Sequence, residues 1–390
     1  IATINGVDKR EYSRYTYSFE RLLKRQRWYA FGLKPREISE RVVDVLKEAK
    51  IAANTDFSRF DGHGSNLMRD FERMLLLRYF NPDHHEQLCV LHQAQYKSKA
   101  KLALGTKFMT EYMRTSGSPD TSIMNSIFNA YIAYLGLRID GREPDEAWDG
   151  LGLYGGDDGL TPDIDVKNYV SAAQMVGQEL TFEPVTRGKR GIKFLARVYS
   201  PDVWFGNPSS MCDLKRQLSK FHVTVQMPAN VSASMKLQEK ARSYILSDMN
   251  TPIVGEFCAA VKRCSGGQLV FDERCRPMLP WNGEIEMENQ YPNEPGEWMM
   301  DELSLVLPEV DLKSFVAWAA SASSLPALLL PSLLKEPTPA KSSVPVVVDG
   351  TRVGEGKDAQ PDPLLERKQE VKNDDVDEKS VKVGEPSPPP

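Results

Sequence analysis

The sequence predicts an α+β fold, in which a region of alternating strands and helices is followed by a mostly helical lobe. Short apolar runs of strand length are interleaved with helical periodicity between residues 51 and 205, and helical segments dominate from 206 to about 335. The chain has 390 residues, of which 41% are hydrophobic, so it can bury a sizeable core. Its length favours more than one subdomain.

The elements of the first region can be placed in order. Lys34-Pro35-Arg36 predicts an extended turn, because proline disfavours helix at the residue before it, and a helix is expected to resume near Ser39. The apolar run 51–55 predicts a strand. Further helices are expected at 67–79, 85–95 and 165–178, and further strands within 101–114 and at 151–154, 160–161 and 192–199.

Residues 336–390 differ in composition from the rest of the chain. They contain no aromatic side chain and are rich in Pro, Lys, Asp, Glu and Val. Such a segment cannot bury enough apolar surface to offset the entropy lost on ordering, so we expect a disordered tail. The net charge of -5 argues against a uniformly basic surface, although basic residues cluster locally at 24–41 and 187–193.

Cysteine spacing predicts reduced thiols. No C-x2-C pair occurs among the five cysteines, which are Cys89, Cys212, Cys258, Cys264 and Cys275. His85, Cys89 and His92 follow a helical spacing that could hold zinc. Because no fourth ligand is evident, an ordinary helix face is the favoured interpretation.

The chain begins with Ile1 rather than methionine, and we expect it to be a fragment of a longer protein. It shows no signal peptide. The most apolar stretch, residues 315–334, is interrupted by Pro326 and Pro331. It is therefore predicted to be a core helix and its exit instead of a membrane span.

Carboxylates from two separate strands are predicted to converge. Asp157 and Asp158 stand at the tip of a tight hairpin in the run 154–159, and Asp56 follows the strand at 51–55. Phosphodiester synthesis needs two divalent ions roughly 3.5–4 Å apart, which such carboxylates can hold. Mg²⁺ prefers oxygen ligands and keeps several waters. An isolated Asp-Asp-Gly sequence, by contrast, is more often a solvated turn.

A turn of small residues at 116–120 leads into a helix with a polar stripe. Ser118 is predicted as its N-cap and Gly136 as its approximate end. Thr121, Asn125 and Asn129 recur every fourth residue and so share one face. We predict that Asn125 and Asp61 together hydrogen-bond a ribose 2'-hydroxyl. The competing interpretation is an exposed amphipathic helix with a capped start.

Three motifs now stand in a fixed order and spacing. Asp56-x4-Asp61, Ser116-Gly117-x3-Thr121-x3-Asn125 and Gly156-Asp157-Asp158 resemble motifs A, B and C of viral RNA-dependent RNA polymerases. The residues around them are most similar to the RNA replicase of nodaviruses, positive-strand RNA viruses of insects and fish. The resemblance is strong over roughly the first half of the chain.

The resemblance implies a right-hand polymerase core with an antiparallel-sheet palm. Partial fingers are expected at 1–50, the palm at 51–205 with a fingers-side insertion near 80–112, and a mostly helical thumb at 206–335. The tail at 336–390 lies outside this core.

The resemblance also implies roles for particular residues. Asp56, Asp157 and Asp158 would be catalytic and metal-binding, and Thr121 would join Asp61 and Asn125 in ribose recognition. A lysine between motifs C and E serves such enzymes as general acid; Lys189 is the candidate, with Arg187, Arg190 and Lys193 close by. Residues expected to bind nucleotide or RNA are Lys34, Arg36, Arg41, Ser116, Gly117 and Arg197, the last in a run, 194–197, that resembles the motif supporting the nascent strand.

The implied activity is template-directed RNA synthesis, with Mg²⁺ or Mn²⁺ as cofactor, ribonucleoside triphosphates as substrates, and RNA as template and product. Family membership further implies self-association, membrane attachment through upstream regions, and replication complexes on host cytoplasmic membranes, with the mitochondrial outer membrane expected.

Two alternatives stay open: a palm resembling that of nucleotide cyclases, and an inactive palm that serves as an RNA-binding or assembly scaffold. Cyclases lack the Ser-Gly-x3-Thr-x3-Asn helix, and a scaffold would be favoured by loss of Asp56 or Asp157, which are both present.

Overall fold

The structure is a computed structural model that describes residues 5–101, 105–224, 230–269 and 289–329, together with the backbone of residues 346–348 and 351–353. The chain divides into two compact units, residues 1–335 and 336–390, and each is described by itself. The predicted α+β class is confirmed, because the first unit combines helices with antiparallel sheets.

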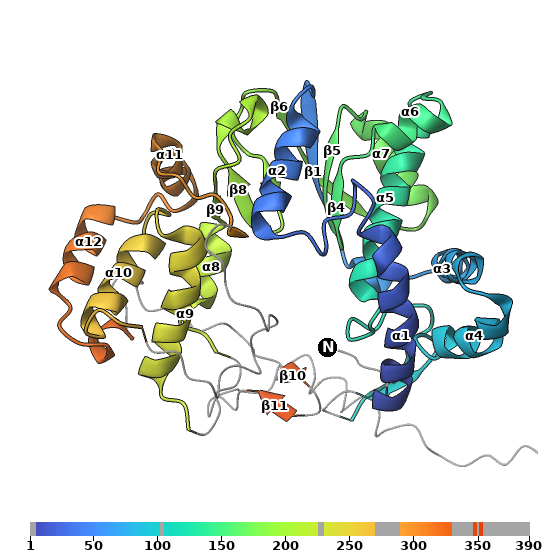
Figure 1. Cartoon of the computed structure of the whole chain (residues 1–390), viewed down its shortest axis with the longest axis horizontal. Coiled ribbons are helices and arrows are strands. Elements are labelled where there is room, and N and C mark those ends of the chain that lie inside the picture. Colours follow the sequence, from blue (N-terminus) through green and yellow to red (C-terminus); the bar gives the residue numbers. More distant parts are fainter. Residues whose placement is uncertain are drawn as a thin grey trace, which may run out of the picture. The chain divides into compact units, whose positions relative to one another are not determined.

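A four-stranded antiparallel sheet lies at the centre of the first unit (Figure 1). Its strands, in spatial order, are β4 (Leu153–Gly155), β5 (Asp158–Pro162), β1 (Ile51–Phe57) and β6 (Leu180–Thr186). Strand β1 therefore pairs with β5 on one side and with β6 on the other. The sequence analysis missed β6, which contains Pro184; the proline is tolerated because β6 is an edge strand.

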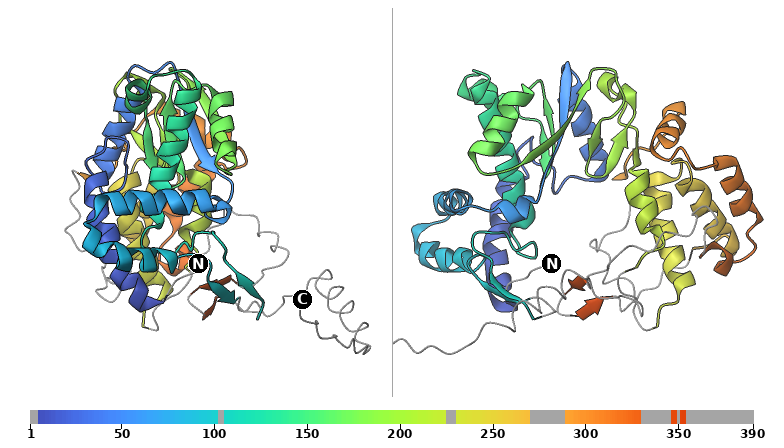
Figure 2. Two further views of the ribbon diagram at one scale, coloured as in Figure 1. Left: turned by 90° about the vertical axis from the view of Figure 1, so that its right-hand side faces the viewer. Right: turned by 180° about the vertical axis from the view of Figure 1, so that it is seen from behind.

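Helices cover both faces of this sheet (Figures 1 and 2). Ala53 and Phe57 of β1 belong to a core that includes residues of α5 (Thr121–Ile139) and α7 (Val166–Met175). Ala52 belongs instead to a second core, shared with α2 (Pro35–Leu46). Because side chains two residues apart on a strand share a face, Asn54 and Asp56 lie on the same face as Ala52.

The first core also includes residues of three further helices. These are α1 (Gly6–Leu23), α3 (Asn66–Tyr79) and α4 (His85–Gln93), followed by a two-stranded ribbon of β2 (Lys99–Lys101) and β3 (Lys107–Met109). Helix α6 spans Pro144–Asp149. Single 3₁₀ turns occupy Phe60–His63, Pro82–His84, Pro201–Phe205 and Pro326–Leu328.

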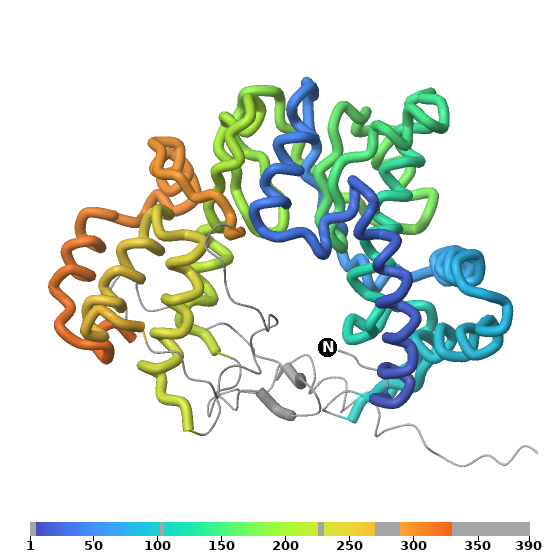
Figure 3. Tube along the Cα trace, in the orientation of Figure 1, coloured from blue at the N-terminus to red at the C-terminus, as the bar shows by residue number. Residues whose placement is uncertain are grey.

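A small three-stranded sheet leads into the helical lobe, which is yellow to orange in Figure 3. Its strands are β7 (Lys193–Phe194), β8 (Arg197–Tyr199) and β9 (Ser210–Cys212). The helices that follow are α8 (Leu214–Phe221), α9 (Ala233–Asp248), α10 (Val254–Cys264), α11 (Glu297–Val306) and α12 (Leu312–Ser321). Aromatic rings fill their shared core: Phe257 stacks on both Phe315 and Trp318.

Two predicted helix starts were wrong. Helix α2 begins at Pro35 instead of near Ser39, because proline suits the first turn of a helix, where no backbone N–H is needed. Helix α5 begins at Thr121 with Asp120 as its N-cap, and it continues to Ile139. The Ser118 hydroxyl lies 2.5 Å from Asp120 Oδ1 and is not the cap.

The strand predicted at 192–199 is a hairpin. Leu195 and Ala196 adopt positive φ angles of 47° and 59°, so the chain turns back between β7 and β8. Two successive residues with positive φ are typical of a tight two-residue hairpin turn, which usually contains Gly or Asn. Because neither residue is present here, the turn could not be predicted from local residue types.

The cysteines in the described part of the chain are free thiols, and His85 and His92 bind different partners. Cys89, Cys212, Cys258 and Cys264 are free thiols, and Cys275 lies outside the described residues. His85 Nε2 bonds the Phe80 carbonyl, whereas His92 Nε2 bonds Glu72. None of the helices searched, which lie in the described residues, is long and apolar enough to cross a membrane.

In the second unit, strands β10 (Val346–Val348) and β11 (Thr351–Val353) pair antiparallel. Four valines and a threonine at these six positions favour a strand. The disorder predicted for residues 336–390 as a whole stays a prediction. The other residues of 336–390 lie outside the described residues.

The buried ion pair between Arg197 and Asp248 joins β8 to α9. Arg197 Nη1 lies 2.7 and 2.9 Å from the two Asp248 carboxylate oxygens, and the side chains are 5% and 2% exposed. We predict that Asp248→Ala lowers the free energy of unfolding by about 3–5 kcal/mol, because it leaves a buried guanidinium unpaired. Urea denaturation measures this loss. Asp301→Ala, which breaks the exposed pair with Arg190, should cost under about 1 kcal/mol; equal losses would contradict the prediction.

Candidate active site

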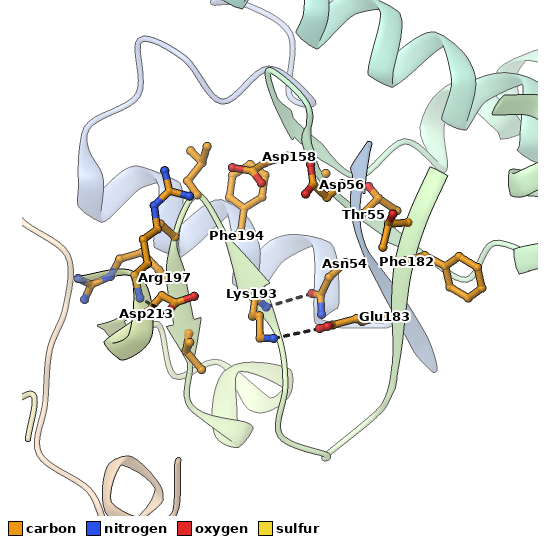
Figure 4. A pocket seen from close by; sticks show the side chains of 16 residues that line it. Asn54, Thr55, Asp56, Asp158, Phe182, Glu183, Lys193, Phe194, Arg197 and Asp213 are labelled. Carbon is orange, nitrogen blue, oxygen red and sulfur yellow. Dashed lines mark hydrogen bonds and ion pairs between the residues drawn. The ribbon is translucent and has the colours of Figure 1, made fainter. Parts of the chain in front are cut away.

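The register between β1 and β5 brings the predicted carboxylates together at one end of these two central strands. Thr55 is paired with Gly159, and within the β4–β5 hairpin Gly155 is paired with Asp158. Asp158 therefore begins β5 beside the end of β1 at Asp56, and Asp157 lies at the hairpin tip. Figure 4 shows Asp56 and Asp158 next to each other at this end.

Helix α5 holds the hairpin from behind. The Asn129 amide group donates to the carbonyls of Gly156, Asp157 and Asp158, at 3.2, 3.0 and 3.1 Å. The Ser126 hydroxyl, one turn earlier, accepts a bond from the Gly156 amide at 2.8 Å. Both α5 side chains are fully buried, so these bonds are protected from water. The polar stripe predicted on this helix thus positions the acidic turn.

Glycines make the tight approach possible. Gly156 has a φ of +72°, a conformation that L side chains rarely adopt. At Gly159, an added Cβ would lie 2.4 Å from Thr55 Oγ1, so a side chain there would push β5 away from β1. The close spacing of the carboxylates depends on both residues.

The two hairpin carboxylates hold their protons more tightly than usual. Burial, followed by the charges of Asp157 and Asp56, raises the pKa of Asp158 to about 6. Neighbouring protein atoms partly bury the Asp157 carboxylate and raise its pKa, although the residue as a whole is exposed at the hairpin tip; Asp56 and Asp61 contribute further. Arg216 of α8 opposes both shifts. The site is therefore one of concentrated negative charge.

Of the predicted ribose-sensing group, Asp61 and Asn125 are hydrogen-bonded to each other, and Asp61 also contacts Ser116, which was predicted to bind nucleotide or RNA. Asn125 Nδ2 donates to Asp61 Oδ1 at 2.8 Å, and the Ser116 hydroxyl donates to Asp61 Oδ2 at 2.5 Å. Gly117 lies in the turn beside Ser116. The Thr121 hydroxyl instead donates to backbone carbonyls at the start of α5, so its contribution in this structure is to the helix end.

A buried network of charges supports the loop that carries Ser116. Glu72, which is 2% exposed, accepts hydrogen bonds from Arg69, His92 and Arg114. Arg114 also pairs with Asp120, the N-cap of α5, at 3.2 Å. The sequence carried no signal of this network, because its members come from α3, α4 and the following loop.

The carboxylates border a cavity of about 270 Å³, shown in Figure 4. Asp56 and Asp158 form one wall, and the β7–β8 hairpin and the start of α8 form the other. Three basic residues line it: the buried Arg197, Lys193, whose Nζ pairs with Glu183 at 3.0 Å, and the exposed Arg216. The sequence analysis named Lys193 only as a neighbour and missed Arg216.

The structure does not bring Lys189 to the carboxylates. Lys189 lies beyond the end of β6, where Thr186 pairs with Ile51, whereas Asp56 pairs with Thr181 at the other end. Five residues of strand separate these ends, a length of about 17 Å. Its assignment as general acid is corrected accordingly: of the four basic residues considered at 187–193, Lys193 is the one that lines the cavity.

Arg41 is placed away from the predicted contacts, whereas Arg197 borders the acidic cavity but is held in a structural ion pair. Arg197 is buried against Asp248, and its guanidinium lies over the Tyr291 ring, so it is a structural residue. Arg41 lines a different cavity together with Pro162, at the end of β5 opposite to Asp158. Lys34 and Arg36 are exposed at the start of α2, close in sequence to a segment whose Ala30 bonds β4 at Tyr154.

No three His, Cys, Asp or Glu side chains in the described part of the chain form a group that could hold a metal ion as it stands. The carboxylates of Asp56, Asp157 and Asp158 nevertheless suit a divalent cation, because they supply oxygen ligands and because burial and neighbouring negative charges raise the pKa of both Asp157 and Asp158.

The sequence of this chain matches a known family. The sequence model of the viral RNA-dependent RNA polymerase family matches residues 14–219, and the chain belongs to that family.

Among curated relatives, the RNA-directed RNA polymerase of striped jack nervous necrosis virus is 31% identical over 93% of this chain, and that of Nodamura virus is 31% identical over 65%. The chain spans 37% and 24% of the lengths of these two relatives. The nodavirus resemblance seen in the motifs is thus confirmed. The RNA-dependent RNA polymerase of a human picorbirnavirus has the same fold, with a TM-score of 0.52 at 18% identity, over 66% of this chain and 50% of that one.

The electrostatic coupling between Asp157 and Asp158 gives a direct prediction. Asp157→Asn removes a neighbouring negative charge, so the pKa of Asp158 should fall from about 6 toward its ordinary value of 3.8. Carboxyl ¹³C NMR titration of the metal-free chain measures this value. Asp44→Asn, on the exposed face of α2, serves as the control and should leave the Asp158 titration unchanged. A shift that is equal in both variants would show that the coupling is absent.

Proposed function

We propose that this chain forms the catalytic part of an enzyme that copies RNA by adding ribonucleotides to the 3'-hydroxyl of a growing strand. The observation that carries the proposal is the convergence of Asp56, Asp157 and Asp158 at one end of the central strands, close enough to Asp61 for its charge to act on Asp157. Support for the RNA template and ribonucleotide substrates comes from family membership and from the names of the nodavirus relatives.

The three carboxylates would hold divalent ions, Mg²⁺ or Mn²⁺. When bound, such ions activate the attacking hydroxyl and neutralise the triphosphate. Asp56 is exposed at the end of β1, and Asp157 is exposed at the hairpin tip, so both are open to ligands from solvent. Asn129 and Ser126 fix the backbone of the turn and thereby limit how far the Asp157 and Asp158 carboxylates can move.

Basic side chains at the cavity would neutralise the negative charge that develops on the leaving pyrophosphate. Lys193 lines the cavity with Asp56 and can be released from Glu183, because that ion pair is exposed and therefore weak. A protonated lysine near a departing pyrophosphate can neutralise it and donate a proton. We propose Lys193 in place of Lys189 for this role.

The ribose-sensing group would distinguish ribonucleotides from deoxyribonucleotides. The Asp61 carboxylate accepts hydrogen bonds from Asn125 and Ser116, which fix its orientation. Each carboxylate oxygen can still accept a further hydrogen bond from a ribose hydroxyl. A 2'-hydroxyl can both donate and accept, whereas a deoxyribose leaves such a polar group unpaired.

The same proposal places the working enzyme in membrane-bound replication complexes of the host cytoplasm, where copies of the protein would associate. Its support is the resemblance to nodavirus replicases. Fractionation of infected cells on density gradients, with an antibody to this chain, tests it. Recovery of the protein only in the soluble fraction would contradict this part of the proposal.

We predict that Asp157→Asn abolishes synthesis while the fold is retained. One carboxylate fewer weakens ion binding at an exposed turn and opens no cavity, so incorporation of labelled ribonucleotides should fall on the order of 100-fold or more. The measurement uses the longer parent protein with an RNA template, and Asp44→Asn is the control. A folded Asp157→Asn protein with normal incorporation would favour the alternative of an RNA-binding scaffold.

We predict that Asn125→Ala narrows the preference for ribonucleotides. Loss of a contact worth about 1 kcal/mol reduces the ratio of kcat/KM for ribonucleotides to kcat/KM for deoxyribonucleotides roughly fivefold. The exposed Ser122, three residues earlier on α5, supplies the control Ser122→Ala, which should leave the ratio unchanged. If Asn125→Ala reduced both rates equally, the residue would be needed for folding of the site and not for sugar choice.

A further inference from the structure

The ribbon formed by β2 and β3 carries three lysines on one face. Lys99 is paired with Met109, and Lys101 is paired directly with Lys107. Residues two apart on a strand point to the same side, and directly opposite residues share a side. Lys99, Lys101 and Lys107 therefore form one surface, named here the lysine face.

The lysine face has no acidic partner among the described residues. All three side chains belong to exposed residues, and none takes part in an ion pair with any residue that the structure describes. Like charges directly opposite each other weaken a strand pair. The pairing of Lys101 with Lys107 therefore costs the ribbon stability, which a bound polyanion would restore. Lys97 differs, because its ammonium lies 4.5 Å from the centre of the Tyr112 ring.

The base of the ribbon is firmly held. The Ser98 amide donates to the Thr110 hydroxyl at 2.9 Å, and the Thr110 amide donates to the Ser98 carbonyl at 3.0 Å. Just below, the Tyr96 and Tyr112 rings are stacked, and the Arg69 guanidinium lies over Tyr96. Figure 2 shows the ribbon, in teal, extending beyond α3 and α4. The lysine face is thus presented outward on a fixed support.

The opposite side of the ribbon indicates which polyanion fits. It carries Ala100 and Phe108, and the Phe108 ring is 39% exposed. A membrane surface would require a broad apolar face below the basic residues, and two side chains do not supply one.

We propose that the lysine face binds the phosphate backbone of single-stranded RNA, at a site distinct from the carboxylates Asp56, Asp157 and Asp158. The inference rests on the proposed function only in taking RNA as the polyanion that the protein meets. Binding at the ribbon requires neither nucleotide nor divalent ion. It can therefore be tested with catalysis switched off, and it can fail while the proposed polymerase activity stands.

The test compares three variants of the 390-residue chain. One replaces Lys99, Lys101 and Lys107 with Gln, and a second replaces the same lysines with Arg. The matched control replaces three exposed lysines elsewhere, Lys47, Lys167 and Lys262, with Gln and so has the same net charge as the first. Fluorescence anisotropy of a labelled 20-nucleotide single-stranded RNA is measured at several salt concentrations in EDTA.

Loss of three phosphate contacts should reduce the slope of log K against log salt by about 2, since each contact to a single strand contributes about 0.7. The Arg variant should retain the slope, as should the control. Circular dichroism and the melting temperature confirm that each variant is folded. Equal slopes for the Gln variant and the control would overturn the proposal. So would unchanged RNA binding together with lost binding to phosphatidylserine vesicles, which would assign the face to membranes.

Discussion

The pairing of β1 with β5 is the constraint on which the site depends. It places Asp56 beside Asp158 and leaves Asp157 at the adjoining hairpin tip, so three carboxylates lie together at one end of the central strands. Burial, together with repulsion between the neighbouring carboxylates, raises the pKa values of Asp157 and Asp158. Backbone hydrogen bonds of a central strand, with helices packed on both faces, hold this unfavourable arrangement in place.

Helix α5 connects the parts of the site. Asn129 and Ser126 hold the acidic hairpin, and Asn125, one turn earlier, holds Asp61. The N-terminus of the same helix is tied by Asp120 to Arg114 and thereby to the buried network around Glu72. A displacement of α5 would therefore move the hairpin and the ribose-sensing group together. Such coupling is expected of rigid elements that carry several functional side chains.

Positive charge is divided between structural and surface roles. Arg187 donates to the carbonyls of Leu46, Ala49 and Trp204, and Arg197 is buried against Asp248, so both guanidinium groups are used to join elements. Lys193 and Arg216 face the acidic cavity instead. Guanidinium groups suit the first task because they offer several donors in a fixed plane.

The sequence by itself determined the features that depend on neighbouring residues. The glycines around Asp157 predicted a hairpin tip, and the recurrence of Asn125 and Asn129 predicted one polar helix face; both agree with the structure. The tertiary structure alone decided which basic residues reach the carboxylates. Lys189 and Lys193 are four residues apart, yet only Lys193 lines the cavity, because strand register and the turn at 195–196 set their positions. Contacts such as that of Asn54 with Gly191, 137 positions apart, leave no trace in local spacing.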